Sequence, residues 1–398
     1  GVLQDDSSNA NDNEASNVLS LIYDNTNPTL DIATAETDPT NTSPFAVTFT
    51  FSEDMDSFEA DDLTVTNATI GNFNMVSASE FTADITPIAD GLVTIELEFD
   101  SVEDLAGNPN EAATFSITYD ATAPTVVISS MVADPTNAAF DVSFTFYEFV
   151  VYFVVNDFHF SFGIPSDLVF ANNEATLTIT PVDDGIVSVF LPADATEDFA
   201  GNGNVASNTF EVLYDATRPT VTIATDASDP TNAGFTATIT FSEDVTGFEL
   251  SDIVFDNATP SAFNPVSASE YTVFVTPIDD GTVSIDVSEN VAEDAATNGN
   301  EASDLFEITF DGTRPIPVIS SDVVSPTNAP FLVTITFEED VFGFTIDDID
   351  AGDAVVSDFI PVSAREYTAI ITPTTDGEVI VSVPEAVTEA LATNPNEA

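Results

Sequence analysis

The chain has 398 residues, with 70 Asp and Glu against 3 Lys and Arg, and its formal net charge is −67. This charge excludes nucleic acid as a natural partner and argues against binding to anionic membranes. Hydrophobic residues still make up 43% of the chain and include 33 Phe, so a folded protein is expected rather than a disordered acidic tail. The absence of Cys excludes disulfides, and no apolar run is long enough to predict a membrane-spanning helix.

Three short motifs recur along the chain at intervals of 94 to 96 residues. They are Pro-Thr-Asn at 39–41, 135–137, 230–232 and 326–328, Asp-Gly at 90–91, 184–185, 280–281 and 376–377, and Tyr/Phe-Asp-x-Thr-x-Pro beginning at Tyr23, Tyr119, Tyr214 and Phe310. This period is that of a sandwich domain and is too long for a solenoid repeat. We therefore expect four repeats at 24–119, 120–214, 215–310 and 311–398, with residues 1–23 as the last strand and preceding loop of an upstream repeat.

In chain order, the first predicted element is the last strand of the upstream repeat. Residues 11–24 resemble residues 298–311, and Leu19, Leu21 and Tyr23 hold the inward positions of a final strand. The fourth repeat, by contrast, stops before a final strand of its own. Two interpretations stay open. Either further repeats continue the chain in both directions, which we favour, or residues 11–24 complete the fourth repeat of a neighbouring subunit by strand addition.

Within each repeat, apolar and polar residues alternate, which is the signature of β-strands. In the third repeat the first such strand covers 235–241, the Pro-Ile-Asp-Asp-Gly sequence at 277–281 is a strong turn signal, and further alternation covers 283–287 and 306–310. No segment has a convincing helical period. Six or seven short strands per repeat, each with one buried face, predict an all-β fold, a tandem array of immunoglobulin-like β-sandwich domains in a linear fibre.

The second repeat diverges from the others. Where they read Phe-Ser-Glu-Asp or Phe-Glu-Glu-Asp, it reads Phe-Tyr-Glu-Phe and continues as an apolar stretch over residues 146–162. Glu148 and Asp157 keep their positions, whereas Phe149 replaces an acid. The stretch indicates either an adhesive surface or a larger core. His159 within it is expected to be packed or exposed rather than a metal ligand.

The third repeat contains the succession FSEDVTGF, SDI, VSASEYT, VTPIDDGTVSIDV, EDAATNGNEAS and DGTRP. This succession resembles the bacterial Ig-like repeats of very long surface adhesins, in particular Bacteroidota adhesins associated with attachment and gliding. The resemblance covers nearly the whole chain. It implies an extracellular segment at the bacterial cell surface whose partners are neighbouring repeats, like filaments, glycans or surfaces. Such repeats are similar to other adhesin arrays in which calcium stiffens the interdomain linkers.

Acidic residues are expected to gather where one repeat meets the next. In sandwich topology the end of the second strand, the start of the third, the loop before the last strand and the incoming linker all lie at one pole. The predicted sets are Asp24, Glu53, Asp54, Asp62, Asp104 and Asn108 in the first repeat; Asp120, Glu148, Asp157 and Asp198 in the second; Asp215, Glu243, Asp244, Asp252 and Asp294 in the third; and Asp311, Glu339, Asp340 and Asp348 in the fourth. The Asp-Gly hairpin of the preceding repeat is expected to face each set.

Carboxylates held together without a cation repel one another, and calcium takes six to eight oxygen ligands of the kind these sets offer. Zinc is disfavoured because the chain has no Cys and one His. The alternative is a set of solvated turn residues on a salt-adapted acidic surface. The site with Asp24 is expected to bind best and the site with Asp120 worst, because Phe149 replaces an acid there. Arg218 and Arg314 are expected to weaken the third and fourth sites by pairing with a carboxylate, and Arg365 is expected to be a surface residue.

Catalysis is not expected, because the chain has no Cys nucleophile and no Lys base, and its one His does not recur with the repeats. Two classes of function stay open. One is a passive structural stalk, and the other is a binding module whose faces contact glycans or surfaces. A halophile's acidic surface protein without a specific metal is a third interpretation.

Overall fold

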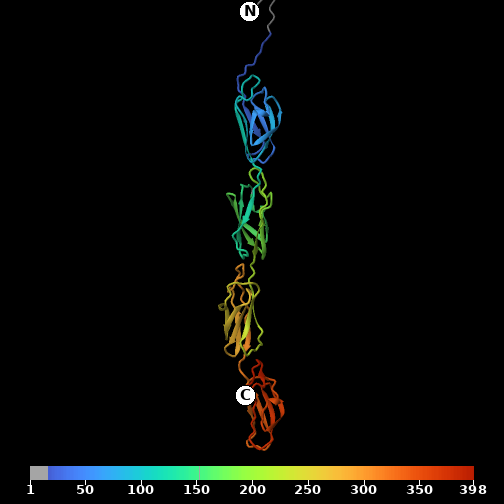
Figure 1. Cartoon of the computed structure of the whole chain (residues 1–398), viewed down its shortest axis with the longest axis vertical. Helices are drawn as coiled ribbons and strands as arrows, with labels where there is room; N and C mark the ends of the chain where they lie inside the picture. Colours follow the sequence, from blue (N-terminus) through green and yellow to red (C-terminus); the bar gives the residue numbers. More distant parts are fainter. Residues whose placement is uncertain (1–16, 152) are drawn as a thin grey trace, which may run out of the picture. The chain divides into compact units, whose positions relative to one another are not determined.

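The computed structural model describes residues 17–151 and 153–398, and within them every regular element is a β-strand except for four single-turn 3-10 helices (Figure 1). The predicted all-β fold is therefore confirmed. No helix in these ranges is long and apolar enough to cross a membrane. Two compact units make up the chain. The first runs through Met131 and includes Phe140–Thr180 and Ser188–Glu211, and the second comprises Val132–Ala139, Pro181–Val187 and Val212–Ala398.

The first repeat lies in the first unit and forms two antiparallel sheets, ordered β1-β2-β5-β4 and β3-β6-β7. Its elements are β1 (Leu30–Thr34), β2 (Phe45–Phe51), η1 (Ala60–Asp62), β3 (Leu63–Thr66), β4 (Ala68–Met75), β5 (Glu80–Pro87), β6 (Gly91–Leu97) and β7 (Ala113–Tyr119). The sheets share one core, to which β2 contributes Phe49, β6 contributes Ile95 and β7 contributes Ile117. This is the packing of a β-sandwich.

The second repeat is divided between the two units and has the same sheet orders, β8-β9-β12-β11 and β10-β13-β14. Its elements are β8 (Val126–Ser129), β9 (Phe140–Phe146), η2 (Val155–Asp157), β10 (His159–Ser161), β11 (Gly163–Ala171), β12 (Glu174–Pro181), β13 (Gly185–Phe190) and β14 (Phe210–Tyr214). The divergent sequence at 146–162 therefore does not change the topology.

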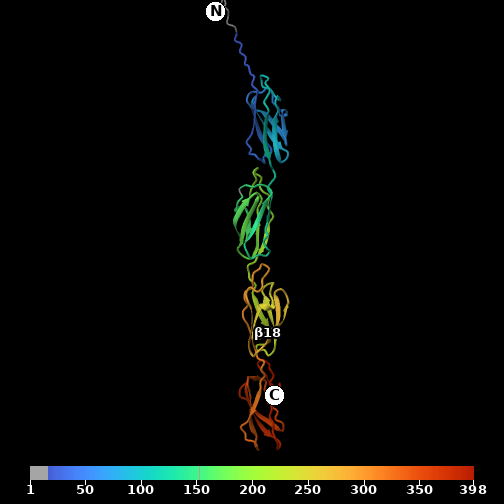
Figure 2. The same cartoon turned by 90° about the vertical axis from the view of Figure 1, so that its left-hand side faces the viewer.

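The third and fourth repeats lie in the second unit. The third repeat forms sheets β15-β16-β19-β18 and β17-β20-β21, with strand β18 labelled in Figure 2. Its elements are β15 (Val221–Thr225), β16 (Phe235–Phe241), η3 (Leu250–Asp252), β17 (Ile253–Asp256), β18 (Ala258–Pro265), β19 (Glu270–Pro277), β20 (Gly281–Val287) and β21 (Phe306–Phe310). Those of the fourth are β22 (Pro317–Ser320), β23 (Phe331–Phe337), β24 (Val341–Phe342), η4 (Ile346–Asp348), β25 (Ala354–Pro361), β26 (Glu366–Pro373) and β27 (Glu389–Ala390).

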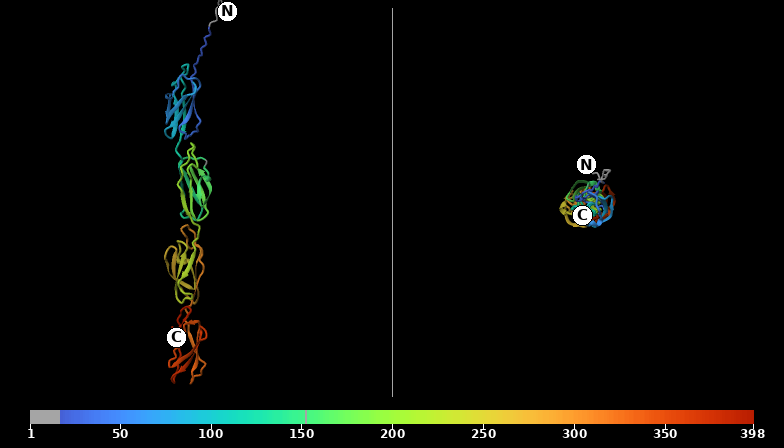
Figure 3. Two further views of the ribbon diagram at one scale, coloured as in Figure 1. Left: turned by 90° about the vertical axis from the view of Figure 1, so that its right-hand side faces the viewer. Right: turned by 90° about the horizontal axis from the view of Figure 1, so that it is seen from above.

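The buried faces follow the alternation in the sequence. Along β16, Phe235, Ala237, Ile239 and Phe241 are at most 5% exposed, while the threonines between them are not buried. An aromatic group closes one end of this core, where Phe248 packs edge-on against Phe241 and Tyr271, each at a ring-centroid distance of 4.9 Å. The predicted inward residues of the third repeat are confirmed. Figure 3 shows the strands of each repeat from a further side.

The last strand of a repeat also pairs with the Pro-Thr-Asn segment of the same repeat. Tyr119, Tyr214 and Phe310 each form a parallel bridge, to Thr40, Thr136 and Thr231 respectively. In the first repeat the Thr40 N–H donates to the Thr118 carbonyl at 2.9 Å, and the Asp120 N–H donates to the Thr40 carbonyl at 3.0 Å. The Thr118 N–H donates to the Asp38 carboxylate at 3.0 Å. The motif therefore ties the end of each of these repeats to the segment that leads into its own second strand.

The fourth repeat keeps the four-stranded sheet β22-β23-β26-β25 but not the second sheet. Among its described residues the second sheet is reduced to the pair β24–β27 and an isolated bridge between Asp350 and Ser382. Residues 378–381, which correspond to β20 by sequence, form no strand. In the third repeat β20 pairs with β17 on one side and with β21 on the other. Among the described residues of the fourth repeat, no strand takes the place of β21.

Candidate metal sites

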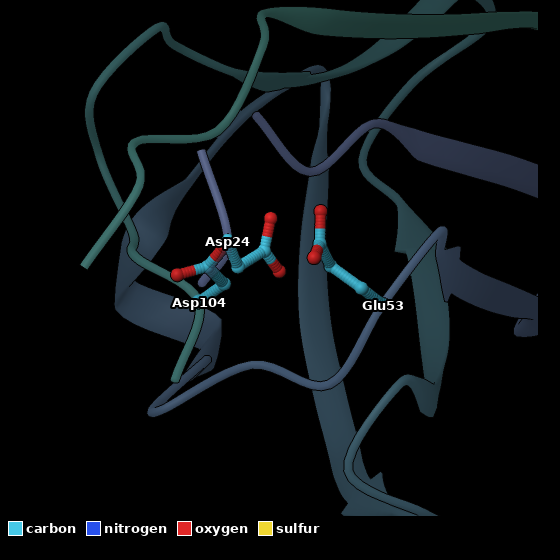
Figure 4. Close-up of side chains that lie close together, drawn as sticks. All are labelled: Asp24, Glu53 and Asp104. Carbon is cyan, nitrogen blue, oxygen red and sulfur yellow. The ribbon is translucent and has the colours of Figure 1, made fainter. Parts of the chain in front are cut away.

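Three acids from distant segments of the first repeat meet at one point (Figure 4). Carboxylate oxygens of Asp24, Glu53 and Asp104 all lie within 4.8 Å of one another. Asp24 belongs to the segment before β1, Glu53 follows β2, and Asp104 belongs to the loop between β6 and β7. Asp104 is buried, Glu53 is half-buried and Asp24 is exposed. The fold thus gathers three of the acids that the sequence predicts at this pole.

The third repeat has the same arrangement. Carboxylate oxygens of Asp215, Glu243 and Asp294 lie within 4.8 Å of one another, with Asp294 buried and the other two half-buried. The three residues correspond one by one to Asp24, Glu53 and Asp104. A cluster that forms twice at equivalent positions reflects the repeat rather than the chance approach of surface side chains.

A local hydrogen-bond network holds the loop aspartate in place. In the third repeat Asn298 donates to Asp294 twice, from its backbone N–H at 2.8 Å and from its side-chain amide at 2.9 Å. The same amide donates to the backbone carbonyl of the linker residue Asp215 at 2.9 Å. Asn300 is fully buried, and its side-chain Oδ1 accepts from the backbone N–H groups of Val291 and Ala292. Asn298 therefore fixes both the loop carboxylate and the linker, while Asn300 shapes the loop.

The glutamate of each cluster sits in an unfavourable electrostatic environment. Burial raises the pKa of Glu243, and the carboxylates of Asp294, Asp215 and Asp184 raise it further. Burial likewise raises the pKa of Glu53, together with Asp24 and Asp104. A raised glutamate pKa means that the folded protein disfavours the charge at this position. A bound cation would reverse that preference.

The second repeat assembles its own acids around Glu148. Burial raises the pKa of this carboxyl, followed by the charges of Asp120, Asp198 and Asp90. One carboxylate oxygen of Glu148, Oε2, is buried without a hydrogen-bond partner. Phe149, which replaces the second acid of the motif, is 63% exposed and its side chain is not needed for this arrangement. Asp120, Glu148 and Asp198 do not form a three-acid cluster within 4.8 Å as their counterparts in the first and third repeats do, and the expected weakest binding in this repeat stays a prediction.

The fourth repeat departs most from the pattern. Ala390 stands where the other repeats have Asp104, Asp198 and Asp294. Burial and Asp311 raise the pKa of Glu339, whereas the Arg365 guanidinium lowers it. Arg365 also pairs with Asp340 at 2.6 Å and donates to the Glu338 carbonyl. Arg365 is exposed, as expected from the sequence, and it also brings a positive charge close to Asp340 and Glu339.

Several predicted ligands lie outside the clusters. Asp54, Asp244 and Asp340 are exposed and belong to neither three-acid cluster. In each repeat one further predicted aspartate instead accepts a hydrogen bond from the backbone N–H three residues earlier, at 2.6 to 2.8 Å. These aspartates are Asp62, Asp157, Asp252 and Asp348. These four carboxylates cap the 3-10 helices η1 to η4. The sequence placed them at the correct end of a strand, but local capping explains them without a metal.

The two linker arginines do not touch the clusters either. Arg218 donates to the carbonyls of Gly299 and Asn300 and pairs with Glu289 at 3.5 Å. Arg314 makes the equivalent contacts to the carbonyls of Pro395 and Asn396, and pairs with Glu385 at 3.3 Å. Their role in the structure is to pin the linker to the loop before the last strand, so the expected pairing with a cluster carboxylate is not what the structure shows.

The sequence did not reveal how the linkers are held by the preceding repeat. Asp184 of the Asp-Gly hairpin accepts from the Ala216 N–H at 2.8 Å and from the Thr217 hydroxyl at 2.5 Å. Asp90 with Thr122, and Asp280 with Thr313, make the same contact. These hydrogen bonds lower the pKa of all three aspartates. The threonine that recurs in each linker, together with the recurring Asp-Gly hairpin, was the available signal in the sequence.

The apolar stretch of the second repeat contributes Phe146, Val150 and Phe158 to the core. Phe153 packs edge-on against Phe146 and Phe158, each at 5.0 Å, as Phe58 does against Phe51 and Phe81 in the first repeat. His159 is exposed and stacks on Phe190. Some apolar surface does remain open to solvent, notably on Tyr147, Phe149 and Phe162, which are 54–68% exposed.

Comparison with known proteins identifies the repeats. The model of the bacterial Ig-like domain matches residues 24–121, 120–214, 215–310 and 311–398. The chain belongs to this bacterial Ig-like domain family. No curated protein sequence matches the chain.

Solved structures with a similar fold include surface proteins of bacteria. Invasin, a bacterial integrin-binding protein, is 12% identical, with 92% of this chain and 77% of that one covered and a TM-score of 0.37. A tetra-tandem repeat from the extending region of a large adhesion protein is 17% identical, covering 92% and 89%, with a TM-score of 0.28. An S-layer protein is 14% identical, covering 90% and 64%, with a TM-score of 0.21. Because all three TM-scores are below 0.5, these similarities carry no argument about this chain.

Proposed function

We propose that this chain is a stalk segment of a bacterial surface adhesin, and that calcium bound at the start of its repeats stiffens the joints between them. Membership of the bacterial Ig-like family over four tandem repeats supports the structural role. The observation that carries the calcium proposal is the pair of equivalent clusters, Asp24 with Glu53 and Asp104, and Asp215 with Glu243 and Asp294. An extracellular position, where calcium is abundant, is part of the same proposal.

The donor set suits calcium. It consists of carboxylate oxygens and contains no sulfur or imidazole. Calcium accepts such ligands in flexible geometry, whereas zinc prefers nitrogen and sulfur. Oε2 of Glu148 in the second repeat is buried without a hydrogen-bond partner, and a cation or water would satisfy it.

The cation would stiffen a joint because the acids come from separate segments. Asp215 lies in the linker, directly after the last strand of the second repeat, whereas Glu243 and Asp294 belong to the body of the third. An ion held by all three connects the linker to the repeat that follows. The hydrogen bonds of Asp184 with Ala216 and Thr217, called the clamp below, already connect the same linker to the repeat that precedes it. Together the two contacts would fix the linker from both sides.

We expect the sites to differ in affinity. The first and third repeats have complete three-acid clusters. The second repeat has no such cluster within 4.8 Å, although Asp120 and Asp198 raise the pKa of Glu148, so its affinity is expected to be lower. The fourth is expected not to bind, because Ala390 replaces the loop aspartate and Arg365 supplies positive charge near Glu339. Three ions per chain is therefore the expected maximum for these sites.

Isothermal titration of the chain with calcium, after treatment with chelator, tests the proposal. Saturable binding of two or three ions with a rise in melting temperature is expected, and magnesium should be much weaker because it requires a smaller and more rigid site. Diffuse binding without saturation, equal for both ions, would support a merely acidic surface. A binding screen of the chain against glycans tests the other class of function, an adhesive module, for which the exposed side chains at 147–162 are the best candidates.

A further inference from the structure

The Pro-Thr-Asn segment of one repeat also contacts a loop of the next repeat. In the first compact unit, the side-chain amide of Asn41 in the first repeat donates to Oδ1 of Asn202 in the second, at 3.1 Å. In the second compact unit, the amide of Asn137 in the second repeat donates to Oδ1 of Asn298 in the third, also at 3.1 Å. The same bond between equivalent residues thus forms at two successive joints.

The acceptor of this bond is the asparagine that holds the loop aspartate. The amide of Asn202 donates to the Asp198 carboxylate and to the carbonyl of the linker residue Asp120, both at 2.9 Å. Asn298 makes the same two bonds in the third repeat. An amide that accepts at its oxygen is a stronger donor at its nitrogen, because hydrogen bonds in a chain polarise one another. The preceding repeat therefore acts on both the loop aspartate and the linker through one side chain.

Next to this bond, the loop lies directly against the preceding repeat. Gly201 has a left-handed backbone, with a φ of +88°, and a Cβ added to it would lie 3.7 Å from the side-chain nitrogen of Asn41. In the third repeat Thr297 takes this position with a φ of +69°. A β-branched residue rarely adopts that backbone, and such strain persists only where the surrounding structure holds it. The Thr297 hydroxyl accepts from the Asn137 amide at 3.4 Å, so the strained residue gives Asn137 a second acceptor across the joint.

The clamp is a separate attachment at the same joint. Between the second and third repeats, Asp184 holds the linker through Ala216 and Thr217. Asn137 instead holds a loop in the body of the third repeat. A single attachment to the linker leaves the next repeat free to turn about it, whereas two attachments at separate points oppose that rotation. The asparagine contact therefore limits bending that the clamp alone allows.

We propose that the asparagine of the Pro-Thr-Asn segment is a positioning residue for the acid cluster of the following repeat, and that it couples the angle of the joint to the loop aspartate. At the joint before the third repeat, the coupling runs from Asn137 through Asn298 to Asp294. Bending of the joint breaks the first of these bonds. Oδ1 of Asn298, a residue only 8% exposed, then loses its partner, and its amide holds the Asp294 carboxylate less firmly.

The same coupling regulates the affinity for a cation, a step that rests on the calcium sites proposed above. A joint in which the asparagine contact is made keeps Asp294 at the cluster, so it binds the ion more tightly than a bent joint does. Because coupling between two equilibria is reciprocal, an ion in the cluster in turn favours the asparagine contact. The site of the third repeat therefore depends on a side chain of the second repeat.

Hydrogen exchange of the full chain in chelator tests the contact without any metal. In Asn137→Ala, the backbone amides of residues 294–298 should exchange about three to ten times faster, because the loop loses one hydrogen bond. The equivalent loop at 198–202 should keep its rate, and Asn41→Ala should give the reverse pattern. Asn137→Asp fills the same space without the amide donor, so its exchange should resemble that of Asn137→Ala rather than that of the wild type.

Calcium titration gives a readout that a purely structural role of Asn137 within its own repeat would not change. The parent chain carries Glu53→Gln and Glu148→Gln, which leaves the cluster of the third repeat as the site to be measured. In this chain Asn137→Ala should weaken calcium binding by about threefold to tenfold. Asn232→Ala is the matched control, because it removes the equivalent side chain from the third repeat itself, and it should leave the affinity unchanged.

Three results would overturn the proposal. They are wild-type exchange at residues 294–298 in Asn137→Ala, wild-type exchange there in Asn137→Asp, and equal weakening of calcium binding by Asn137→Ala and Asn232→Ala. If the parent chain shows no saturable calcium binding while the faster exchange in Asn137→Ala persists, the proposed calcium sites are wrong and the positioning contact is supported.

Discussion

Replacement of Glu243 by Gln tests whether this glutamate is a metal ligand or has only a structural role. The substitution removes one charge from the cluster and changes the size of the side chain little. Carboxylate oxygens of Asp215 and Asp294 lie within 4.8 Å of this group. Two unit charges at that distance repel by about 0.9 kcal/mol in bulk water and by about 3.5 kcal/mol at an effective dielectric constant of about 20. Two such pairs, taken near the lower limit because of screening, give a repulsion of about 2 kcal/mol.

In chelator, Glu243→Gln should therefore stabilise the third repeat. A gain of about 1–2 kcal/mol raises the melting temperature of a domain of this size by roughly 5 °C or more. In calcium the order should reverse. The wild-type site gains about 2.7 kcal/mol when free calcium is 100 times its dissociation constant, and the variant loses that gain. The expected result is thus a change of sign between the two conditions.

Calorimetry of the full chain in chelator and in calcium measures both effects, and isothermal titration should show one ion fewer for the variant. Asp244→Asn is the matched control, because it removes the neighbouring charge from an exposed residue outside the cluster. Its response to calcium should equal that of the wild type. If Glu243→Gln lowers the melting temperature equally in both conditions, the glutamate has a structural role and the reasoning is wrong.

Three further predictions follow from the same geometry. In chelator, the stability of the folded protein should fall as the pH rises above 4.5, the ordinary pKa of Glu. The pKa values of Glu53 and Glu243 are raised, so above that pH the folded state binds more protons than the unfolded state. Calcium should abolish this fall. Stability should also fall as the pH drops below 3.8, the ordinary pKa of Asp, since the clamp aspartates have lowered pKa values; melting curves between pH 3 and 8 test both signs. Asp184→Ala should increase proteolysis of the linker at 215–219 even in calcium, whereas Asp183→Ala, next to it, should not. Ala390→Asp combined with Arg365→Ser should create an additional calcium site, seen as one more ion per chain in titration, and unchanged stoichiometry would contradict the assignment of the loop acid.

The sequence was a reliable guide to the parts of the fold that repeat with period two. Phe235 to Phe241 alternate between core and surface as predicted, because burial of one face is what that pattern encodes. The loop acid Asp294 and the strand-end acid Glu243 could also be placed at one pole, since sandwich topology brings those segments together.

The details of the sites could not be read in the same way. Glu243 and Asp244 are adjacent and chemically alike, yet only Glu243 belongs to the cluster while Asp244 is exposed. Successive side chains after a strand diverge in direction, and the backbone of the turn decides which of them points inward. Asp252 was likewise expected at the cluster. It instead caps a 3-10 helix by accepting a hydrogen bond from the N–H of Glu249, three residues earlier. The clamp between Asp184 and Thr217 joins residues 33 positions apart, so the recurrence of both residues in successive repeats is the only signal in the sequence, and no local pattern reveals the contact.

The parallel bridge at the Pro-Thr-Asn segment has a mechanical consequence. Tension on a repeat pulls the segment at Thr40 toward the start of the chain and the end of β7 toward the next repeat. Because the two segments run parallel, this load shears the three hydrogen bonds that join Thr40, Asp38, Thr118 and Asp120 instead of opening them one at a time. Each bond contributes only about 1 kcal/mol at equilibrium. Loaded together, they must break in a single step, so a repeat can resist pulling far better than its modest thermodynamic stability suggests.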